Sequence, residues 1–352
     1  MNKINRIQPK KIGIIRALWL GDLLCAIPAI RSLKALLPQS SITLIGLPWA
    51  KAFTERFSKY FDGFMEFPGF PGIPEKAFYY QNLMGFLPKV HAENFDLIIQ
   101  LQGNGSIINS AAAMMGAKHL AGYYVPGAYC PNPDLFMPYP EAGSEIKKHL
   151  KLAQFLGFES AEESLEFPIF PSEERAFQQL CTTYKLQKGH FICVHAGARD
   201  VKRCWGAKKF ASIADRLATK GYQIVLTGTE AERETVKQVE ELMQANPVNL
   251  TGKTNLGILA ALIREAKLLL SNDTGVAHIA AAVKTPSIII FLTSDPKRWA
   301  SINKKLHRII LPDQADNLDF VLTYAAQTLI SQMIPGEIKK NDMRGVNQSE
   351  KA

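Results

Sequence analysis

Short apolar runs recur along the first half of the chain and alternate with a segment of helical periodicity. The runs lie at 11–16, 41–46 and 96–101, and the helical pattern covers about 23–37. Apolar runs of this length without strict alternation are typical of strands buried on both faces of a parallel sheet. Strands that alternate with helices predict a doubly wound α/β sheet.

The second half repeats this organisation. Helices are expected at about 210–220, 230–245 and 256–265, and strands are expected at 190–195, 221–227, 266–270 and 286–291. We therefore expect two Rossmann-like domains whose parallel sheets face a central cleft. Ligands of open α/β sheets bind at the carboxyl ends of the strands, so the loops after the strands are the candidate sites.

The segment Pro168-Ile169-Phe170-Pro171 marks a plausible linker. The expected domains are 1–168 and 169–335, followed by a polar tail at 336–352 that should fray. Residues 61–88 are rich in Phe, Pro and Gly. We do not expect them to be regular throughout, and they are candidates for an acceptor-facing loop or a partner surface.

Composition narrows the class of protein. The chain has 352 residues and 47% hydrophobic residues, enough for two real cores. Its net charge of +9 favours anionic ligands or membrane surfaces. No basic stripe is interleaved with aromatic residues, so no nucleic-acid partner is expected. Five cysteines without a CxxC pair indicate a reducing cytoplasm. Since no apolar run reaches about 18 residues, any membrane contact should be peripheral.

The segment 271–278 is the most informative of the candidate sites. It joins an apolar strand to a small-residue helix, which leaves backbone N–H groups free at a helix N-terminus, where a phosphate can bind. Asp273, Thr274 and His278 fall within about one helical turn, and Gly275 allows close approach of a ligand. The alternative is an ordinary capped helix with a structural histidine.

Two further loops of the second half follow strands. The loop that begins at His195 contains Ala196, Gly197 and Ala198 and then Lys202, a pattern suited to a diphosphate. The alternative is a solvated basic loop.

After the next strand of the second half, Glu232 opens a helix. A carboxylate in this position often binds ribose hydroxyls, although it also simply favours the helix dipole.

In the first half, Asp22 stands at the carboxyl end of the first strand, near the start of a helix. It is either a helix cap or a general base. Pro28 is unusual six residues later and should kink or shorten this helix.

Several motifs are missing. The stretch Gly103-Asn104-Gly105 lacks the third glycine of a dinucleotide fingerprint, and the chain has no P-loop. It contains no Asp-x-Asp and no Gly-x-Ser-x-Gly, so neither a metal nor a nucleophilic serine is indicated. No cofactor is expected.

Three motifs in order resemble glycosyltransferase family 9, whose best-known members are ADP-heptose:lipopolysaccharide heptosyltransferases. They are Gly-Asp-x-Leu-x-x-x-Pro at 21–28, His-Ala-x-x-Arg-Asp-x-Lys-x-x-Trp at 195–205 and Asp-Thr-Gly-x-x-His at 273–278. The resemblance implies a GT-B fold, inversion at the transferred sugar and no metal requirement. The N-terminal domain would bind the acceptor and the C-terminal domain the nucleotide sugar.

The resemblance also implies residue roles. Asp22 would be the catalytic base, and Lys202 would bind the donor diphosphate. Gln102 and Asn104 are expected on the acceptor side, although the stretch 102–110 has no lysine where the heptosyltransferases carry one. The donor set comprises Ala196, Gly197 and Ala198 through their backbone, Glu232 at the ribose, Thr254 at the adenine, Asp273 at the sugar, and Thr274, Gly275 and His278 around the phosphates.

The resulting hypothesis is a cytoplasmic inverting glycosyltransferase that uses a nucleotide-diphosphate sugar, with ADP-heptose as the expected donor. Its acceptor would be a cell-surface glycan or a glycolipid of the lipopolysaccharide type, and peripheral contact with the inner face of the inner membrane is allowed. Two alternatives stay open. One is a GT-B-like sugar-nucleotide epimerase, and the other is a non-catalytic nucleotide- or glycan-binding relative.

Overall fold

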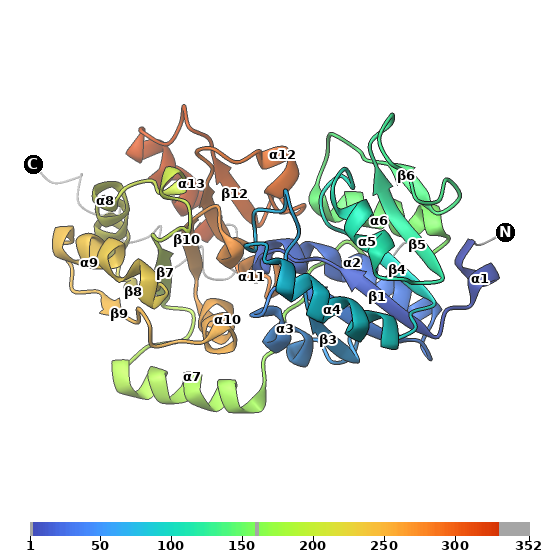
Figure 1. The fold of residues 1–352 in the computed structure, drawn as a ribbon. Helices are drawn as coiled ribbons and strands as arrows, with labels where there is room; N and C mark the ends of the chain where they lie inside the picture. Colours follow the sequence, from blue (N-terminus) through green and yellow to red (C-terminus); the bar gives the residue numbers. More distant parts are fainter. Residues whose placement is uncertain (1–2, 159–161, 331–352) are drawn as a thin grey trace, which may run out of the picture. The chain divides into compact units, whose positions relative to one another are not determined.

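The computed structural model describes residues 3–158 and 162–330 and divides the chain into two compact units (Figure 1). Unit 1 contains Met1–Phe170 together with Lys297–Ile302, and unit 2 contains Pro171–Pro296 and the residues from Asn303 onward. The return of 297–302 to unit 1 was not expected from the sequence. The polar tail expected at 336–352 lies outside the described residues.

Unit 1 is a parallel six-stranded sheet covered by helices on both faces. The strands are β1 (Lys11–Ile15), β2 (Ser41–Gly46), β3 (Gly63–Glu66), β4 (Leu97–Gln100), β5 (His119–Tyr124) and β6 (Phe136–Pro138). The helices are α1 (Lys3–Ile7), α2 (Leu20–Leu36), α3 (Ala50–Arg56), α4 (Tyr80–Ala92), α5 (Ile108–Met114) and α6 (Glu145–Leu156). The strand order β3-β2-β1-β4-β5-β6 is that of Rossmann folds.

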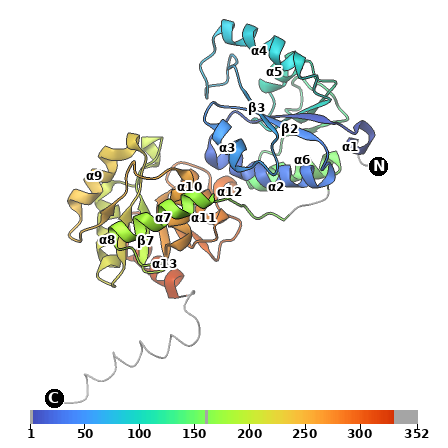
Figure 2. The same cartoon turned by 90° about the horizontal axis from the view of Figure 1, so that it is seen from below.

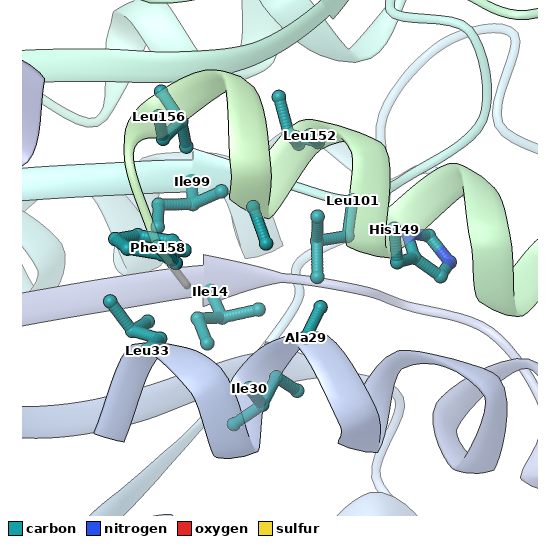
Figure 3. A pocket seen from close by; sticks show the side chains of 11 residues that line it. Ile14, Ala29, Ile30, Leu33, Ile99, Leu101, His149, Leu152, Leu156 and Phe158 are labelled. Atoms are coloured by element: carbon teal, nitrogen blue, oxygen red, sulfur yellow. The ribbon is translucent and has the colours of Figure 1, made fainter. Parts of the chain in front are cut away.

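Successive side chains of the central strands of unit 1 serve opposite faces of the sheet. Ile15 and Ile98 pack toward α4 and α5 in one core. Ile14 and Ile99 face α2 and α6, where they line an apolar cavity of about 20 Å³ (Figure 3). One polar side chain, His149 of α6, reaches this cavity. The strands are therefore mainly apolar because both faces are covered.

One expectation about unit 1 needs correction. Helix α2 runs from Leu20 to Leu36 with Pro28 inside it, so Pro28 does not shorten the helix. The ring removes one backbone donor, but the surrounding packing keeps the helix continuous, since residues 23–30 are all buried. The segment 61–88 is not regular throughout, as expected. It contains β3 and the start of α4, and residues 67–79 between them form no helix or strand.

The segment that leads into the linker is bonded to unit 1. Glu166 pairs with Arg31 at 3.1 Å and also with Lys59, and the Tyr60 hydroxyl donates to it. Arg56 donates to the Pro168 carbonyl at 2.7 Å. These contacts explain why the division between the units falls just before α7.

Unit 2 repeats the architecture with a second parallel six-stranded sheet. Its strands are β7 (Phe191–His195), β8 (Gln223–Leu226), β9 (Val248–Asn249), β10 (Leu268–Asn272), β11 (Ser287–Ile290) and β12 (His307–Ile310). Its order β12-β11-β10-β7-β8-β9, read from β9, is again the Rossmann order. The helices of unit 2 are α7 (Pro171–Tyr184), α8 (Ala207–Ala218), α9 (Arg233–Leu242), α10 (Leu256–Glu265), α11 (Gly275–Ala282) and α13 (Leu318–Ile330), and its 3-10 turns are η1 (Val201–Arg203) and η2 (Glu230–Glu232). Helix α12 (Pro296–Trp299) begins with the last residue of this segment of unit 2, and its other residues belong to unit 1.

The core of unit 2 on one face of the sheet comes from α8, α9 and α13. Amphipathic α8 buries Phe210, Ile213 and Leu217 there, at helical spacing. Helices α7 and α10 contact each other elsewhere in the unit (Figure 2). Among the described residues, no helix is both long and apolar enough to cross a membrane.

Candidate functional site

In each unit the strand order reverses between the two central strands of the sheet. In unit 1 this pair is β1 and β4, and in unit 2 it is β7 and β10. The connections after these strands lead to opposite faces, which makes the carboxyl ends of the pair the usual ligand position in such sheets. Asp22 follows β1, and Asp273 follows β10. The two candidate sets are described unit by unit.

Asp22 lies in the first turn of α2 and keeps 20% of its side chain exposed. One carboxylate oxygen accepts from the backbone N–H of Trp19 at 3.4 Å. The other lies 3.7 Å from Nη2 of Arg16. The contact with Trp19 is the helix-end role that the sequence left open, and it is long for a hydrogen bond. The carboxylate is therefore only loosely held by the protein and keeps part of its surface exposed.

Arg16, the residue after β1, fixes the backbone around Asp22. It is fully buried and donates from Nε to the Asp22 carbonyl at 2.8 Å and from Nη1 to the Leu101 carbonyl. Its Nη2 reaches Glu145 of α6 at 3.3 Å. A buried guanidinium needs such partners because an unpaired buried charge is very costly. Arg16 thus joins the ends of both central strands.

Glu145 balances the charge of Arg16 in the interior. It is 4% exposed and accepts from Nε of Arg298, in α12, at 2.8 Å. Burial by itself would raise the pKa of Glu145, but contacts with His149 and the charges of Arg16 and Arg298 outweigh burial and hold the pKa well below its usual range. Glu145 is thus an ionised carboxylate that links β1, α6 and α12.

His149 lies beside this buried pair. Its Nε2 is 3.5 Å from Oε1 of Glu145, yet neither ring nitrogen makes a hydrogen bond of good geometry. Burial and, next, the charge of Arg16 lower the pKa of His149 to about 4, against the opposing effect of Glu145. The imidazole is therefore neutral at pH 7.

The two residues expected on the acceptor side have local partners. Oε1 of the buried Gln102 accepts from the backbone N–H of Ala17 at 2.8 Å. Oδ1 of Asn104 accepts from the backbone and the hydroxyl of Ser106, at 3.1 and 2.8 Å. Gln102 therefore ties the loop after β4 to the loop after β1, and Asn104 shapes its own turn.

In unit 2 the buried side chain of Asn272 holds the loop that follows β7. Its Nδ2 donates to the Ala196 carbonyl at 2.7 Å, and its Oδ1 accepts from the backbone N–H of Trp205 at 3.0 Å. The indole N–H of Trp205 donates to the Ala315 carbonyl at 2.8 Å. Both ends of the loop 196–205 are thus fixed to the last residue of β10, which Asp273 follows.

Gly197 lets the side chain of Glu232 lie close to the main chain. A Cβ at residue 197 would lie 2.4 Å from Cδ of Glu232. The same carboxylate accepts from the backbone N–H of Thr229 at 2.7 Å, and its other oxygen lies 3.8 Å from Nε2 of His195. Burial lowers the pKa of His195, and the charge of Glu232 opposes this. The loops after β7 and β8 therefore meet at this glycine.

Asp273 is 3% exposed, and its carboxylate has two neighbours. Ser294 donates its hydroxyl to Oδ2, and Nη1 of Arg203 lies 3.8 Å from the same oxygen. Arg203 belongs to η1, so the basic turn of the loop after β7 approaches the loop after β10. The two motifs therefore meet within unit 2, and their role as one site stays a prediction.

Helix α11 begins directly after Asp273. Thr274 is its N-cap and accepts from the N–H of Val276 at 3.4 Å, and Gly275 is the first helical residue. His278 is buried in the same helix, and its charge helps to lower the pKa of His307, for which burial is the larger cause. Thr274 is therefore a helix cap, as the alternative interpretation of this segment proposed. The remaining N–H groups of the first helical turn have no partner within the helix.

The remaining donor candidates lie on the same edge of unit 2. Lys202 of η1 is exposed, and its backbone N–H donates to Asp200 Oδ1 at 3.0 Å. The backbone of Ala198 contacts the thiol of Cys204. Thr254 is half-buried in the loop between β9 and α10, which is bonded to the loop after β8 by Gly252 N–H to the Gly228 carbonyl at 2.9 Å.

Sequence reasoning missed four residues that organise these sites: Arg16, Glu145, Asn272 and Arg298. A signal existed for two of them. Arg16 and Asn272 each end an apolar strand, and a polar residue at that position must find a buried partner. Glu145 and Arg298 gave no such signal, because their partners are distant in sequence.

Two Rossmann-like units with these parallel sheets define the GT-B fold of sugar-nucleotide enzymes. The family model described as glycosyltransferase family 9 (heptosyltransferase) matches residues 85–327, so the chain belongs to this family.

Three similar proteins illustrate the membership. Lipopolysaccharide heptosyltransferase 3 of Escherichia coli K12 is 28% identical over 230 residues, which cover 62% of this chain and 65% of that protein, just under two thirds of its length. Lipooligosaccharide heptosyltransferase 2 of Haemophilus influenzae is 28% identical over 317 residues, covering 84% and 86%. The solved structure of E. coli ADP-heptose lps heptosyltransferase II is 21% identical with a TM-score of 0.71, covering 91% of this chain and 99% of that chain.

Proposed function

We propose that this protein is an inverting glycosyltransferase that transfers a heptose from ADP-heptose to an acceptor of the lipopolysaccharide type. The observation that carries the proposal is the pairing of Arg203 with Asp273, which brings the basic loop after β7 to the start of α11. Exposed backbone N–H groups, a lysine and a carboxylate on one sheet edge are suited to a sugar diphosphate. The three similar proteins are named as heptosyltransferases, one of them as an ADP-heptose enzyme, which supports the heptose and the ADP-linked donor.

In this proposal unit 2 binds the donor. Lys202 and the first N–H groups of α11 bind the diphosphate, together with the main chain of 196–198. Asp273 binds the hydroxyls of the sugar, Glu232 binds the ribose, and Thr254 contacts the adenine. The support is that Asn272 and Gly197 place these loops on neighbouring strands.

Unit 1 supplies the proton acceptor in the proposed reaction. The acceptor hydroxyl attacks the anomeric carbon and gives its proton to Asp22 while the bond from that carbon to the diphosphate oxygen breaks. ADP leaves with the electron pair, so negative charge accumulates where Lys202 and α11 stabilise it. Because attack and departure occur on opposite faces, the configuration inverts. The partial exposure of Asp22 and its fixation by Arg16 support this role.

Asp22→Asn tests the base. The variant keeps the size of the side chain but cannot accept the proton, so turnover should fall by about 10²–10⁴. ADP affinity, measured by calorimetry, should not change, because Asp22 belongs to the other unit. Turnover within about twofold of the wild type would reject Asp22 as the base.

Lys202→Ala tests the diphosphate contact. It should raise the donor KM and lower kcat together, because the charge that the lysine neutralises grows in the transition state. Lys208→Ala is the matched control, since Lys208 is exposed at the start of the next helix. Equal kinetics in both variants would remove Lys202 from the site.

A panel of ADP-, GDP- and UDP-sugars identifies the donor. A bound ligand raises apparent stability by mass action, so the largest thermal shift reports the preferred base and sugar. An epimerase would convert one of these donors without acceptor, and a non-catalytic relative would bind it without releasing sugar.

A further inference from the structure

Unit 1 carries a groove of about 500 Å³ away from Asp22, between the edge strand β3 and helix α4. Its walls include Phe64 and Pro68 near β3 and Gln81, Asn82, Gly85 and Lys89 on α4. The volume is within the range of about 300–1,000 Å³ that is typical of small-molecule sites. Its lining is both apolar and polar, and none of these residues has a role in the function proposed above.

Gly85 is the most telling residue of the groove. It lies in the interior of α4, where glycine destabilises a helix relative to alanine. A Cβ at this position would meet no protein atom within 4 Å, and the backbone does not have a positive φ. Neither packing nor backbone conformation within the described chain therefore requires glycine. Its effect is to keep the floor of the groove open.

Three polar side chains surround Gly85 on the same face of α4. Gln81 and Lys89 lie four residues before and after it, and Asn82 lies three before, so all four positions point to one side. Within residues 3–158 and 162–330, the side chains of these three residues make no hydrogen bond or ion pair with the protein. They span about 12 Å along the helix. They can therefore bond to a ligand without breaking an existing contact.

The chemistry of the walls favours a saccharide. Amide groups such as those of Gln81 and Asn82 can donate to and accept from hydroxyl groups. Phe64 and Pro68 supply apolar surface for the C–H faces of a sugar ring. Phe86 of α4, which also lines the groove, adds an aromatic ring.

The charges of the groove favour an anionic substituent. Glu66 pairs with Lys76 inside it, so these two charges largely cancel. Lys89 is then the uncompensated charge of the groove, and a lysine is a point donor suited to phosphate or carboxylate.

We propose that this groove binds a saccharide segment of the acceptor that carries a phosphate or carboxylate group. The inference rests on the proposed function for the nature of the acceptor. Strand β3 is two strands from β1, which is roughly 10 Å along the sheet. A ligand in the groove is therefore a sugar other than the one whose hydroxyl is activated near Asp22. The groove would select the acceptor and leave the chemistry unchanged.

Gly85→Gln tests the groove directly. The new side chain should occupy the floor without a clash, and it favours the helix, so the melting temperature should be equal to or above that of the wild type. Binding of a phosphorylated, deacylated lipopolysaccharide core oligosaccharide, measured by calorimetry without donor, should weaken at least tenfold. Ala113→Gln is the matched control, because it adds the same side chain at an exposed position of α5. Equal affinities in the two variants would overturn the proposal.

Lys89→Gln tests the anionic contact. Affinity for the phosphorylated oligosaccharide should fall about tenfold, whereas affinity for the same oligosaccharide after chemical removal of phosphate should not change. In transfer assays the acceptor KM should rise with kcat and the donor KM unchanged. A fall in kcat alone, or an equal loss with both oligosaccharides, would contradict the proposed contact.

The two proposals fail in different ways. Oligosaccharide binding that depends on Gly85 and Lys89 in a protein that transfers no sugar would keep the groove and reject the transferase. Transfer that is unaffected by both substitutions would keep the transferase and reject the groove. A wild-type protein that does not bind the oligosaccharide would also reject the groove.

Discussion

The two units share one strand order but organise their central strand ends in opposite ways. In unit 1 the end of β1 is held by buried charges, with Arg16 and Arg298 on either side of Glu145. In unit 2 the end of β10 is held by the neutral amide of Asn272, which pairs with two backbone groups. Two cations of the loop after β7 in unit 2, Lys202 and Arg203, remain at least partly exposed.

The difference matches the chemistry proposed for each unit. A base such as Asp22 needs a rigid backbone and a neighbouring positive charge that fixes its orientation. A diphosphate site needs cations that are free to pair with the ligand, so the loop that carries them is better anchored by uncharged groups. Buried charges give strict geometry but make the site depend on each partner, because loss of one leaves the other unpaired.

The largest effect is expected from Arg16→Met. The change removes one partner of the buried Glu145 carboxylate and the donor to the Asp22 carbonyl, so the free energy of unfolding should fall by about 3–5 kcal/mol. Urea denaturation measures it. The double variant Arg16→Met/Glu145→Leu should recover more than half of this loss, because it also removes the unpaired charge. A loss in the double variant equal to the sum of the losses in the two single variants would show that the charge pair does not cause the destabilisation.

The second effect is a pH dependence in unit 1. His149 has a pKa of about 4 in the folded protein and an ordinary value of 6.5, so between these pH values the unfolded state binds more protons. Stability should therefore fall as the pH drops from about 6.5 to 4, by about 3 kcal/mol from this residue. In His149→Leu the difference in unfolding free energy between pH 7 and pH 4.5 should be clearly smaller. An unchanged difference would mean that other groups carry the acid sensitivity.

A smaller effect should follow from Asn272→Ala in unit 2. The change leaves the Ala196 carbonyl and the Trp205 N–H without a partner, which should cost about 2 kcal/mol of stability. The loop that carries Lys202 should then be less well fixed, so ADP affinity should fall about tenfold. Calorimetry with ADP at a temperature well below unfolding checks this. A stability loss with full ADP affinity would make the amide purely structural.

The smallest change is expected from Gly197→Ala. The added methyl group would lie too close to Glu232, and the carboxylate must move, at a cost of about 1 kcal/mol. ADP should bind more weakly if Glu232 contacts the ribose. The double variant Gly197→Ala/Glu232→Ala should regain the stability but not the affinity. Recovery of both would separate Glu232 from nucleotide binding.

The sequence predicted the strands of the central sheets well because they are apolar runs of regular spacing. It did not predict β3 or the start of α4 within 61–88, since Phe, Pro and Gly obscured the pattern there. It proposed Asp22, Asp273 and the loop 196–202 from local motifs, and the structure places each of them at a central strand end. It could not find Glu145 or Arg298, because neither belongs to a local pattern.

What the sequence by itself determined is therefore the class of fold and the motifs of the family, since both depend on neighbours within a few residues along the chain. The tertiary structure decided which buried groups hold those motifs. Arg16 and Glu145 are 129 residues apart, and Glu145 and Arg298 are 153 apart. Only folding brings Arg16 and Glu145 together in the interior, where each neutralises the other, with the partly exposed Arg298 beside them. Folding also gives the open floor at Gly85 its opposing walls.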